Sequence, residues 1–495
     1  MSMRSYVFYD TETSGTNVRF DQVFQFSAAR CDDALSVLDA INLRCRRMSH
    51  IIPHPKALVV TGVDPRGLDA APLSYHEFAR EVHATFTDWA PAIFIAFNGM
   101  RFDEEILRSM FWQNLLYPYL TTSRGSKRLD LLAIIQTALA LNPAVLVVPT
   151  HPLTGKPTLK LEHLAPANGF ANHAAHDAAG DVDATIFLAT LIRQRMPLLW
   201  DAMVDNATQS RAAHTADARE SVLVTHFGKP VVHFTTVIAF GNANDKQTCL
   251  FDLAHDPAPL LDLAVDALTE FMQEGHPAFR RVKTNATPAL FRADHPLVAG
   301  LAPTVPSTPE ERAQRIALIE ARPDFRRRVA AALDRLQESY AKSVHVEEQI
   351  YDGFTTRADE DACKAFHLVS TWQSRVEAAK RLKDARLRKL ANLVIFQHAP
   401  GLMAPHVARA IAEGIAAKRL LTTDEVPWTT IPKALADLDA MEAEAVYDSA
   451  VLANIRSWLL EMREQAETAL CAQAETARHP IQPVNVEGTR IAIVA

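Results

Sequence analysis

Short apolar runs alternate with helical patterns through the first 200 residues, and this alternation restricts the possible folds more than any other feature. Ile93–Phe97 is apolar at every position, which is typical of a strand buried on both faces of a sheet. Tyr6–Asp10 and Val23–Ala29 are further strand candidates, and Ala40–Arg46 is a weaker one. Helical spacing of apolar residues predicts four helices: Tyr75–Thr87, Phe102–Trp112, Leu129–Leu141 and Asp177–Arg195. Together these elements predict a mixed α/β sheet covered by helices.

The pattern changes twice beyond Pro197, which ends the last of these helices. The middle of the chain holds short β-branched runs and two helical patterns: Val222–Thr225, Val231–Phe240, Thr248–Asp252, Leu260–Gln273 and Pro309–Ala321. These favour an α+β part, such as a small barrel with helical insertions. From about Val344 the pattern is helical, and a proline-containing tail follows Arg478. At about 150 residues per domain, we expect three domains and a tail: residues 1–197, 198–342, 343–478 and 479–495.

Composition argues against several classes of protein. Hydrophobic residues make up 48% and charged residues 22% of the chain, so it can bury a core. Five cysteines stand singly without CxxC spacing, which argues against a zinc knuckle and fits a reducing, cytoplasmic location. No apolar run longer than Tyr6–Tyr9 precedes the first acidic residue, and Gln136, Asn142 and Pro143 interrupt the apolar stretch Leu131–Val148. We therefore expect neither a signal peptide nor a membrane span. With a net charge of −7, any nucleic-acid binding must depend on local basic patches.

Two carboxylates follow the first predicted strand. Asp10 and Glu12 in YDTETSG are two residues apart, so at a strand end they point to the same face. Carboxylates this close repel each other unless a cation lies between them, and hard oxygen ligands suit Mg²⁺ or Mn²⁺. Two solvated acids on a surface turn would have the same spacing, so the pair alone leaves that alternative open.

A third carboxylate lies after the central strand. Asp103 begins a helix after the turn that follows Ile93–Phe97. We expect it at the carboxyl edge of the sheet, where ligands bind in open α/β sheets. Its neighbours Glu104 and Glu105 are predicted to be ordinary acidic residues of a first helical turn.

The segment HAAHDAAGDVDAT offers the last candidates. Its spacing fits His176 on a loop and Asp181 one turn into the following helix, with Asp177 as the N-cap. His173 and Asp183 stand close by and are assigned to surface roles.

In order along the chain, DxE, a single Asp and HxxxxD resemble the histidine-containing branch of the DEDD exonuclease superfamily. Longer segments resemble the bacterial exodeoxyribonuclease I family: FNGMRFDEEILRSMFWQNLLYPY, LKLEHLAPANG, AHDAAGDVDATIFLA and EEQIYDGF. The resemblance covers most of the chain. It is close in the first 200 residues, patchy in the middle and recognisable again from EEQIYDGF to about Pro400. About 20 residues at the end have no counterpart.

The resemblance implies a fold and an activity. It implies a ribonuclease H-like α/β exonuclease domain, an α+β SH3-like barrel domain and an all-α C-terminal domain. The family degrades single-stranded DNA from the 3′ end to 5′-mononucleotides, acts in DNA repair and recombination, and uses two-metal phosphodiester hydrolysis. A cytoplasmic monomer without membrane contact is expected.

The resemblance also implies roles for individual residues. Two Mg²⁺ ions, for which Mn²⁺ can substitute, would be held by four carboxylates with Asp10 between them, and His176 would accept a proton from the attacking water. The four carboxylates are Asp10, Glu12, Asp103 and Asp181. The residues implied to bind substrate are Glu12, Thr13, Thr61, Arg108, Tyr119 and Lys160. Arg326 would bind the C-terminal tail of the single-stranded-DNA-binding protein.

Three alternatives stay open at this stage. A proofreading or small-RNA-degrading exonuclease shares the motifs but is usually little longer than the first domain. A catalytically silent single-stranded-DNA-binding or scaffold protein on the same fold would be expected to lack one of the five motif residues, and none is missing. The run Arg375–Lys389 has seven basic and two acidic residues, and it is either a solvated helix face or one wall of a DNA path.

Overall fold

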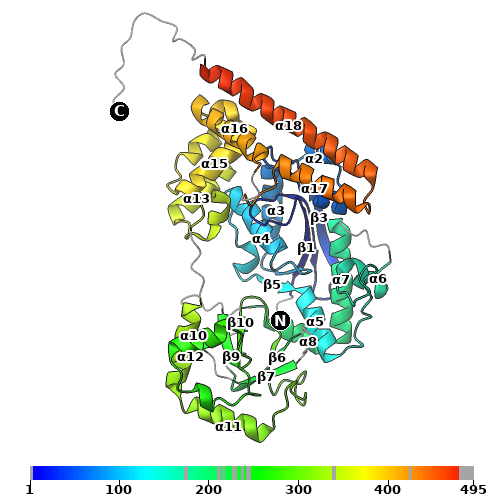
Figure 1. Ribbon diagram of the computed structural model, residues 1–495, viewed down its shortest axis with the longest axis vertical. Coiled ribbons are helices and arrows are strands. Elements are labelled where there is room, and N and C mark those ends of the chain that lie inside the picture. Colours follow the sequence, from blue (N-terminus) through cyan, green and yellow to red (C-terminus); the bar gives the residue numbers. More distant parts are fainter. Residues whose placement is uncertain are drawn as a thin grey trace, which may run out of the picture. The chain divides into compact units, whose positions relative to one another are not determined.

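A computed structural model describes residues 4–171, 177–208, 212, 215, 218–225, 231–235, 239–240, 247–336, 342–422 and 426–478 (Figure 1). The chain divides into two compact units. The first unit joins Met1–Arg46 to Ala71–Thr355, and the second joins Arg47–Ala70 to Thr356–Ala495. The three-domain division expected from the sequence stays a prediction, and its tail, 479–495, lies outside the described residues.

A five-stranded sheet forms the centre of the first unit, in the order β3-β2-β1-β4-β5. Its strands are β1 (Tyr6–Thr13), β2 (Val23–Cys31), β3 (Val37–Arg44), β4 (Ile93–Ala96) and β5 (Lys127–Asp130). β1, β2 and β3 pair antiparallel, whereas β4 pairs parallel with both β1 and β5. The predicted mixed α/β sheet with helices is confirmed.

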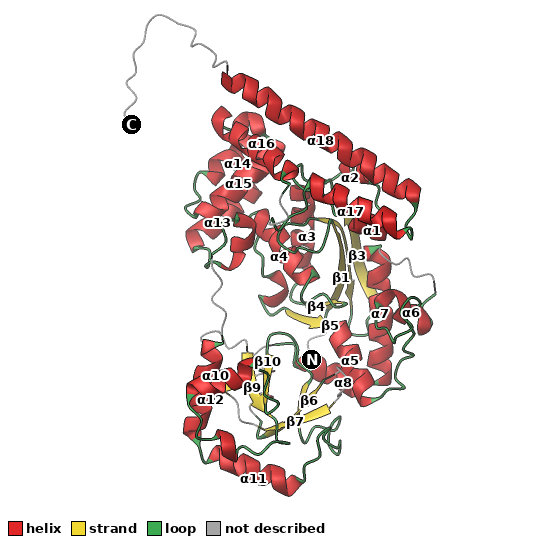
Figure 2. Ribbon diagram, viewed as in Figure 1, coloured by secondary structure: helices red, strands yellow, loops and turns green. Residues whose placement is uncertain are grey.

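Helices cover this sheet (Figure 2). They are α3 (Tyr75–Trp89), α4 (Asp103–Gln113), α5 (Leu131–Leu141), α6 (Leu161–Ala167), α7 (Ala178–Arg195) and α8 (Pro197–Asp205). The predicted helix Leu129–Leu141 begins two residues later, because Leu129 pairs with Ile95 as part of β5. Because Leu129 is apolar like the helix that follows it, the sequence pattern does not show where β5 ends and α5 begins.

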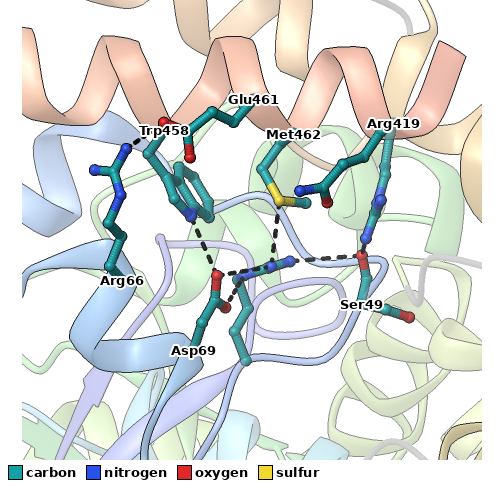
Figure 3. Close-up of a pocket in the computed structure, with 9 residues that line it drawn as sticks. Ser49, Arg66, Asp69, Arg419, Trp458, Glu461 and Met462 are labelled. Atoms are coloured by element: carbon teal, nitrogen blue, oxygen red, sulfur yellow. Dashed lines mark hydrogen bonds and ion pairs between the residues drawn. The ribbon is translucent and has the colours of Figure 1, made fainter. Parts of the chain in front are cut away.

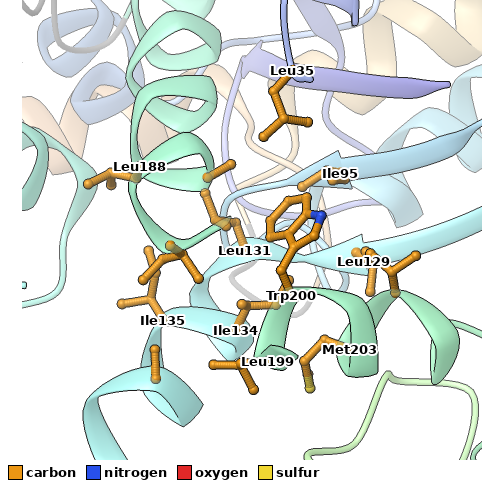
Figure 4. Packing of buried hydrophobic residues seen from close by; sticks show 14 of the residues in the cluster. Leu35, Ile95, Leu129, Leu131, Ile134, Ile135, Leu188, Leu199, Trp200 and Met203 are labelled. Atoms are coloured by element: carbon orange, nitrogen blue, oxygen red, sulfur yellow. The ribbon is translucent and has the colours of Figure 1, made fainter. Parts of the chain in front are cut away.

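The two faces of β1 pack against different helices. Tyr6 and Phe8 belong to the large apolar cluster with α5, α7 and α8, whose central side chain is Trp200 (Figure 4). On the opposite face, the Tyr9 ring packs edge-on against Phe86 of α3, with ring centroids 5.7 Å apart. Since side chains alternate along a strand, the even-numbered residues of β1 face α7 and the odd-numbered ones face α3 and α4.

The rest of the first unit contains two three-stranded sheets, in the orders β10-β9-β8 and β11-β6-β7. The strands are β6 (Glu220–Val224), β7 (Val231–Thr235), β8 (Ala239–Phe240), β9 (Gln247–Phe251), β10 (Phe279–Lys283) and β11 (Leu290–Arg292). The helices here are η1 (Leu120–Thr122), η2 (Ala258–Leu260), α10 (Val265–Gln273), α11 (Pro309–Glu320), α12 (Pro323–Arg335) and η3 (Val346–Tyr351). The predicted strand Val231–Phe240 is two strands, and the sequence reasoning missed β10, β11 and α12.

Every described element of the second unit is a helix. They are α1 (Pro55–Thr61), α2 (Pro65–Asp69), α13 (Arg357–Leu368), α14 (Trp372–Ala379), α15 (Ala385–His398), η4 (Pro400–Leu402), α16 (Pro405–Leu420), α17 (Ile431–Glu444) and α18 (Ser449–Arg478). Leu58 of α1 is buried with Ile431 of α17 and Trp458 of α18 in one apolar cluster. None of the helices among the described residues combines the length and apolar character that a membrane crossing requires.

The basic run Arg375–Lys389 is not one helix face. It spans the end of α14, the connection after it and the start of α15. Arg375 is buried, with its guanidinium carbon 4.6 Å from the centroid of the Trp372 ring, and Arg386 forms an ion pair with Asp384. Of the two alternatives for this run, a single solvated helix face is therefore excluded, and one wall of a DNA path stays a prediction.

Candidate active site

Three of the predicted carboxylates converge beside β1. Asp10 and Glu12 are even-numbered residues of this strand and face α7, whose first turn carries Asp181. One carboxylate oxygen from each of the three residues lies within 4.8 Å of the others. This spacing allows one metal ion to contact all three side chains.

Asp103 approaches the same site from α4. The Thr11 hydroxyl, on the odd-numbered side of β1, donates a hydrogen bond of 2.6 Å to Asp103 Oδ1. The turn before α4 requires Gly99, because a Cβ atom there would lie 2.4 Å from the Ala96 Cβ and 2.8 Å from Asp103 Oδ2. The strand-to-helix turn thus brings the fourth predicted carboxylate to the site.

The electrostatics of these carboxylates favour a bound cation. Burial, followed by the charges of Asp103, Asp181 and Glu12, holds the pKa of Asp10 well above its usual range. Burial is also the main reason that the pKa of Glu12 rises to about 8 and that of Asp103 to about 7. A divalent cation would stabilise the charged forms, and carboxylate oxygens are the ligands that Mg²⁺ and Mn²⁺ prefer. The residues present therefore fit a divalent metal.

Divalent metal binding is expected to weaken as the pH falls from about 8 to about 6. Protons on Glu12 and Asp103 must leave before a cation binds, and their raised pKa values retain these protons in that range. The apparent dissociation constant should rise by up to about tenfold per pH unit for each displaced proton. Calorimetric titration with Mn²⁺ in two buffers of different ionisation enthalpy measures both affinity and proton release. An affinity that does not change with pH would contradict this prediction.

The predicted general base lies outside the described residues, as does His173. The next residue after His176 is Asp177, which is the N-cap residue of α7 but makes no side-chain capping hydrogen bond. Its Oδ1 instead accepts hydrogen bonds from Gln25 Nε2 at 2.8 Å and Arg44 Nη2 at 2.9 Å. These contacts tie the start of α7 to β2 and β3. Asp183 is exposed, as predicted.

Two residues of the first unit that are predicted to bind substrate contact each other: Arg108 on α4 and Tyr119. Arg108 is buried and forms ion pairs with Glu104 at 2.7 Å and Glu105 at 3.4 Å. Its guanidinium carbon is 5.3 Å from the centroid of the Tyr119 ring. Both carboxylates that form ion pairs with Arg108 also belong to α4. In this structure Arg108 is therefore part of an ion-pair network within its own helix.

The other predicted binding residues are dispersed. The Thr13 hydroxyl donates to the carbonyl of Gly15 at 2.8 Å, and Lys160 is exposed beside Glu162, 3.1 Å away. Arg326 is exposed on α12. Thr61 belongs to the second unit, where its hydroxyl donates to the carbonyl of Ala57.

Sequence reasoning missed the role of Glu104, which is not an ordinary residue of a first helical turn. Only 1% of it is exposed, and it accepts hydrogen bonds from the Tyr9 hydroxyl at 3.2 Å and the Thr121 hydroxyl at 2.6 Å. It forms ion pairs with Arg108 and, at 3.2 Å, with Arg128 of β5. We call these five residues the Glu104 cluster. Glu104 and Arg108 are four residues apart, and this spacing was the only available signal.

The segment EEQIYDGF also contacts α4. The Tyr351 hydroxyl donates to Glu105 Oε2 at 2.8 Å, and Arg19 donates to the same oxygen at 2.6 Å. The Trp112 indole donates to the Val346 carbonyl at 3.2 Å. A motif that sequence reasoning placed outside the first domain therefore packs on the helix that carries Asp103.

Comparison with known proteins places the chain among bacterial nucleases by sequence. No family model matches. The chain is 29% identical over 376 residues to exodeoxyribonuclease I of Escherichia coli K12, covering 73% of this chain and 78% of that protein. It is 26% identical over 376 residues to exodeoxyribonuclease I of Haemophilus influenzae, covering 72% and 78%.

Solved structures give the same result. E. coli exonuclease I in complex with a dA16 oligonucleotide matches with a TM-score of 0.78 and 25% identity, over 93% of this chain and all of that one. Exonuclease I from Methylocaldum szegediense matches in fold with a TM-score of 0.78 at 24% identity, over 93% and 100%. The resemblance that the motifs indicate is confirmed, and the chain is a relative of bacterial exodeoxyribonuclease I.

Proposed function

We propose that this protein is a 3′-to-5′ exodeoxyribonuclease that hydrolyses single-stranded DNA to 5′-mononucleotides. The observation that carries the proposal is the convergence of Asp10, Glu12 and Asp181 within 4.8 Å, with Asp103 hydrogen-bonded to the strand between them. Related exonuclease I structures contain dA16 and dT13 oligonucleotides, which supports a single-stranded DNA substrate.

Two Mg²⁺ ions are the proposed cofactor, with Mn²⁺ as a substitute. Asp10, Glu12 and Asp181 would hold one ion, and Asp10 together with Asp103 the other. When bound, such ions stabilise negative charge on a phosphodiester undergoing hydrolysis. Metal-free and zinc-bound structures of E. coli exonuclease I with single-stranded DNA support a metal-dependent site.

The protein's own groups orient the reactants. Thr11 fixes the carboxylate of Asp103 through its hydrogen bond, and Gln25 and Arg44 hold Asp177, the residue that follows His176 in the sequence. His176, as a neutral imidazole, would accept a proton from the attacking water at neutral pH. Thr13, Thr61, Arg108, Tyr119 and Lys160 remain proposed contacts to the strand.

The finer fold assignment and the partners are also proposals. The mixed sheet with helices fits a ribonuclease H-like domain, the two three-stranded sheets fit an SH3-like barrel, and the second unit fits an all-α domain. A structure of SSB/exonuclease I in complex with inhibitor CFAM supports binding of the SSB tail, for which Arg326 is the proposed contact. A monomeric state, a cytoplasmic location and a role in DNA repair stay predictions.

Digestion of a single strand labelled at either end tests the proposal. With Mg²⁺, we expect mononucleotides to be released first from the 3′ end, and EDTA to stop the release. His176→Ala should lower the rate by roughly 10²–10⁴-fold, whereas Asp183→Asn, at an exposed position of α7, should leave it unchanged. A wild-type protein that binds the strand without cleaving it would support the silent binding protein instead.

A further inference from the structure

The second unit contains a hollow of about 570 Å³ between its N-terminal segment and α18 (Figure 3). This volume falls within the range of about 300–1,000 Å³ that small-molecule sites occupy. Five charged side chains line it, three arginines and two carboxylates: Arg47, Arg66, Arg419, Asp69 and Glu461. The lining therefore carries one positive charge more than it has negative charges.

Both carboxylates already have close partners. Asp69 accepts hydrogen bonds from Arg47 Nε at 2.8 Å and Nη2 at 3.2 Å, and from the Trp458 indole at 3.1 Å. Glu461 accepts from Arg66 Nη2 at 2.5 Å. Each of these arginines is thus matched by one carboxylate, which leaves the third arginine as the source of the excess charge.

Arg419 lacks a matching carboxylate. Its Nη2 donates to the carbonyl of Ser49, and its buried Nε has no hydrogen-bond partner. No carboxylate of the described residues forms an ion pair with it. Burial, followed by the nearby charge of Arg47, lowers the pKa of Arg419 to about 10. The enclosed Nε cannot reach a ligand in the hollow, so a bound anion would contact the two terminal nitrogens of Arg419.

We propose that this hollow binds a phosphate monoester, with Arg419 as the main contact to the phosphate group. A planar guanidinium with free donors matches phosphate oxygens in a bidentate manner, and the dianion would offset the repulsion between Arg419 and Arg47. The volume exceeds what a phosphate ion needs, so the site has room for an organic group. Trp458 is 3% exposed and lies under the Arg47 guanidinium, so it offers no ring face for stacking. Recognition is therefore of the phosphate rather than of a base.

The full-length protein in EDTA provides the test, because EDTA removes the divalent cations that would hold a phosphate group at the active site. We expect 5′-dTMP to bind saturably by calorimetry, thymidine not to bind, and the dinucleotide TpT, which has only a phosphodiester, to bind at least about tenfold more weakly. Inorganic phosphate should compete with 5′-dTMP. Equal affinity for TpT and 5′-dTMP, or for thymidine and 5′-dTMP, would overturn the proposal, as would the absence of saturable 5′-dTMP binding.

Two substitutions on α16 locate the bound ligand. Arg419→Gln should weaken 5′-dTMP binding by at least about tenfold, and Arg419→Lys should weaken it less because the charge remains. Arg409→Gln makes the same change in charge at an exposed position of the same helix and should have no effect. An equal loss in Arg409→Gln and Arg419→Gln would indicate a general charge effect and refute the site. A retained thermal unfolding profile in each variant shows that the loss is not caused by misfolding.

Discussion

Asp10→Asn is expected to lower DNA hydrolysis by at least roughly 10³-fold and, at the same time, to raise the Tm of the metal-free protein. The loss of activity follows from its proposed role as a ligand of both metal ions. The gain in stability follows from the raised pKa of Asp10, whose causes are burial and four neighbouring acidic groups. Asparagine fills nearly the same volume without the charge.

The sign of the stability change depends on pH. A carboxyl group with a raised pKa in the folded state costs more free energy as the pH rises above its unfolded value of about 4. The Tm difference between Asp10→Asn and the wild type, measured in EDTA, should therefore be larger at about pH 8 than at about pH 5. Asp183→Asn, at an exposed position of α7, is the control: it should leave activity unchanged and change the Tm much less than Asp10→Asn does, because no neighbouring charge adds to the raised pKa of Asp183. A Tm of Asp10→Asn below that of the wild type at about pH 8 would contradict the prediction that repulsion between carboxylates destabilises the metal-free site.

Glu104→Ala is expected to destabilise the first unit by about 3–5 kcal/mol, because it leaves Arg108 and Arg128 buried without their shared carboxylate. Of its two ion pairs, Arg108 would keep the longer one, to Glu105. Urea unfolding followed by the fluorescence of tryptophans, including Trp112 on the same helix, measures the change. Activity at a temperature where the variant is folded should also fall, since Glu104 adjoins Asp103 and is hydrogen-bonded to Tyr9, the neighbour of Asp10.

Two further variants separate burial from charge in the Glu104 cluster. Glu105→Ala removes a carboxylate from the next position, where the side chain is more exposed, and should cost clearly less. Glu104→Gln keeps the volume and one acceptor for Thr121 and should lie between the two. A change below about 1 kcal/mol for Glu104→Ala, the ordinary value for an exposed ion pair, would show that the cluster contributes no more than a surface contact.

Sequence reasoning predicted the placement of the carboxylates better than their surroundings. The placement of Asp10 and Glu12 follows from strand periodicity and that of Asp103 from a strand-to-helix turn, which are local properties of the chain, whereas their grouping with Asp181 depended on the family resemblance. Burial is not local, and for this reason Glu104 was taken for an ordinary surface acid of a first helical turn.

The errors in the predicted helices and strands also arise because burial and pairing are not local properties of the chain. Lys127–Asp130 is a strand because β4 lies beside it, whereas its own sequence leads directly into an apolar helix. One alternative for Arg375–Lys389 was a solvated helix face, although Arg375 is buried against Trp372. Likewise, no local pattern indicates that residues 47–70 pack with helices more than 300 positions later in the chain.

The second unit combines an early segment, Arg47–Ala70, with the last part of the chain, and this affects how the protein folds during its synthesis. Leu58 and Ile52 find their apolar partners on α17 and α18, which a ribosome produces only after the whole first unit has been synthesised. At about 5–20 residues per second, this part of the nascent chain stays unpaired for tens of seconds. During that time, its apolar side chains are available to chaperones and to neighbouring nascent chains. Translation speed between residues 70 and 431 is thus a determinant of the yield of folded protein.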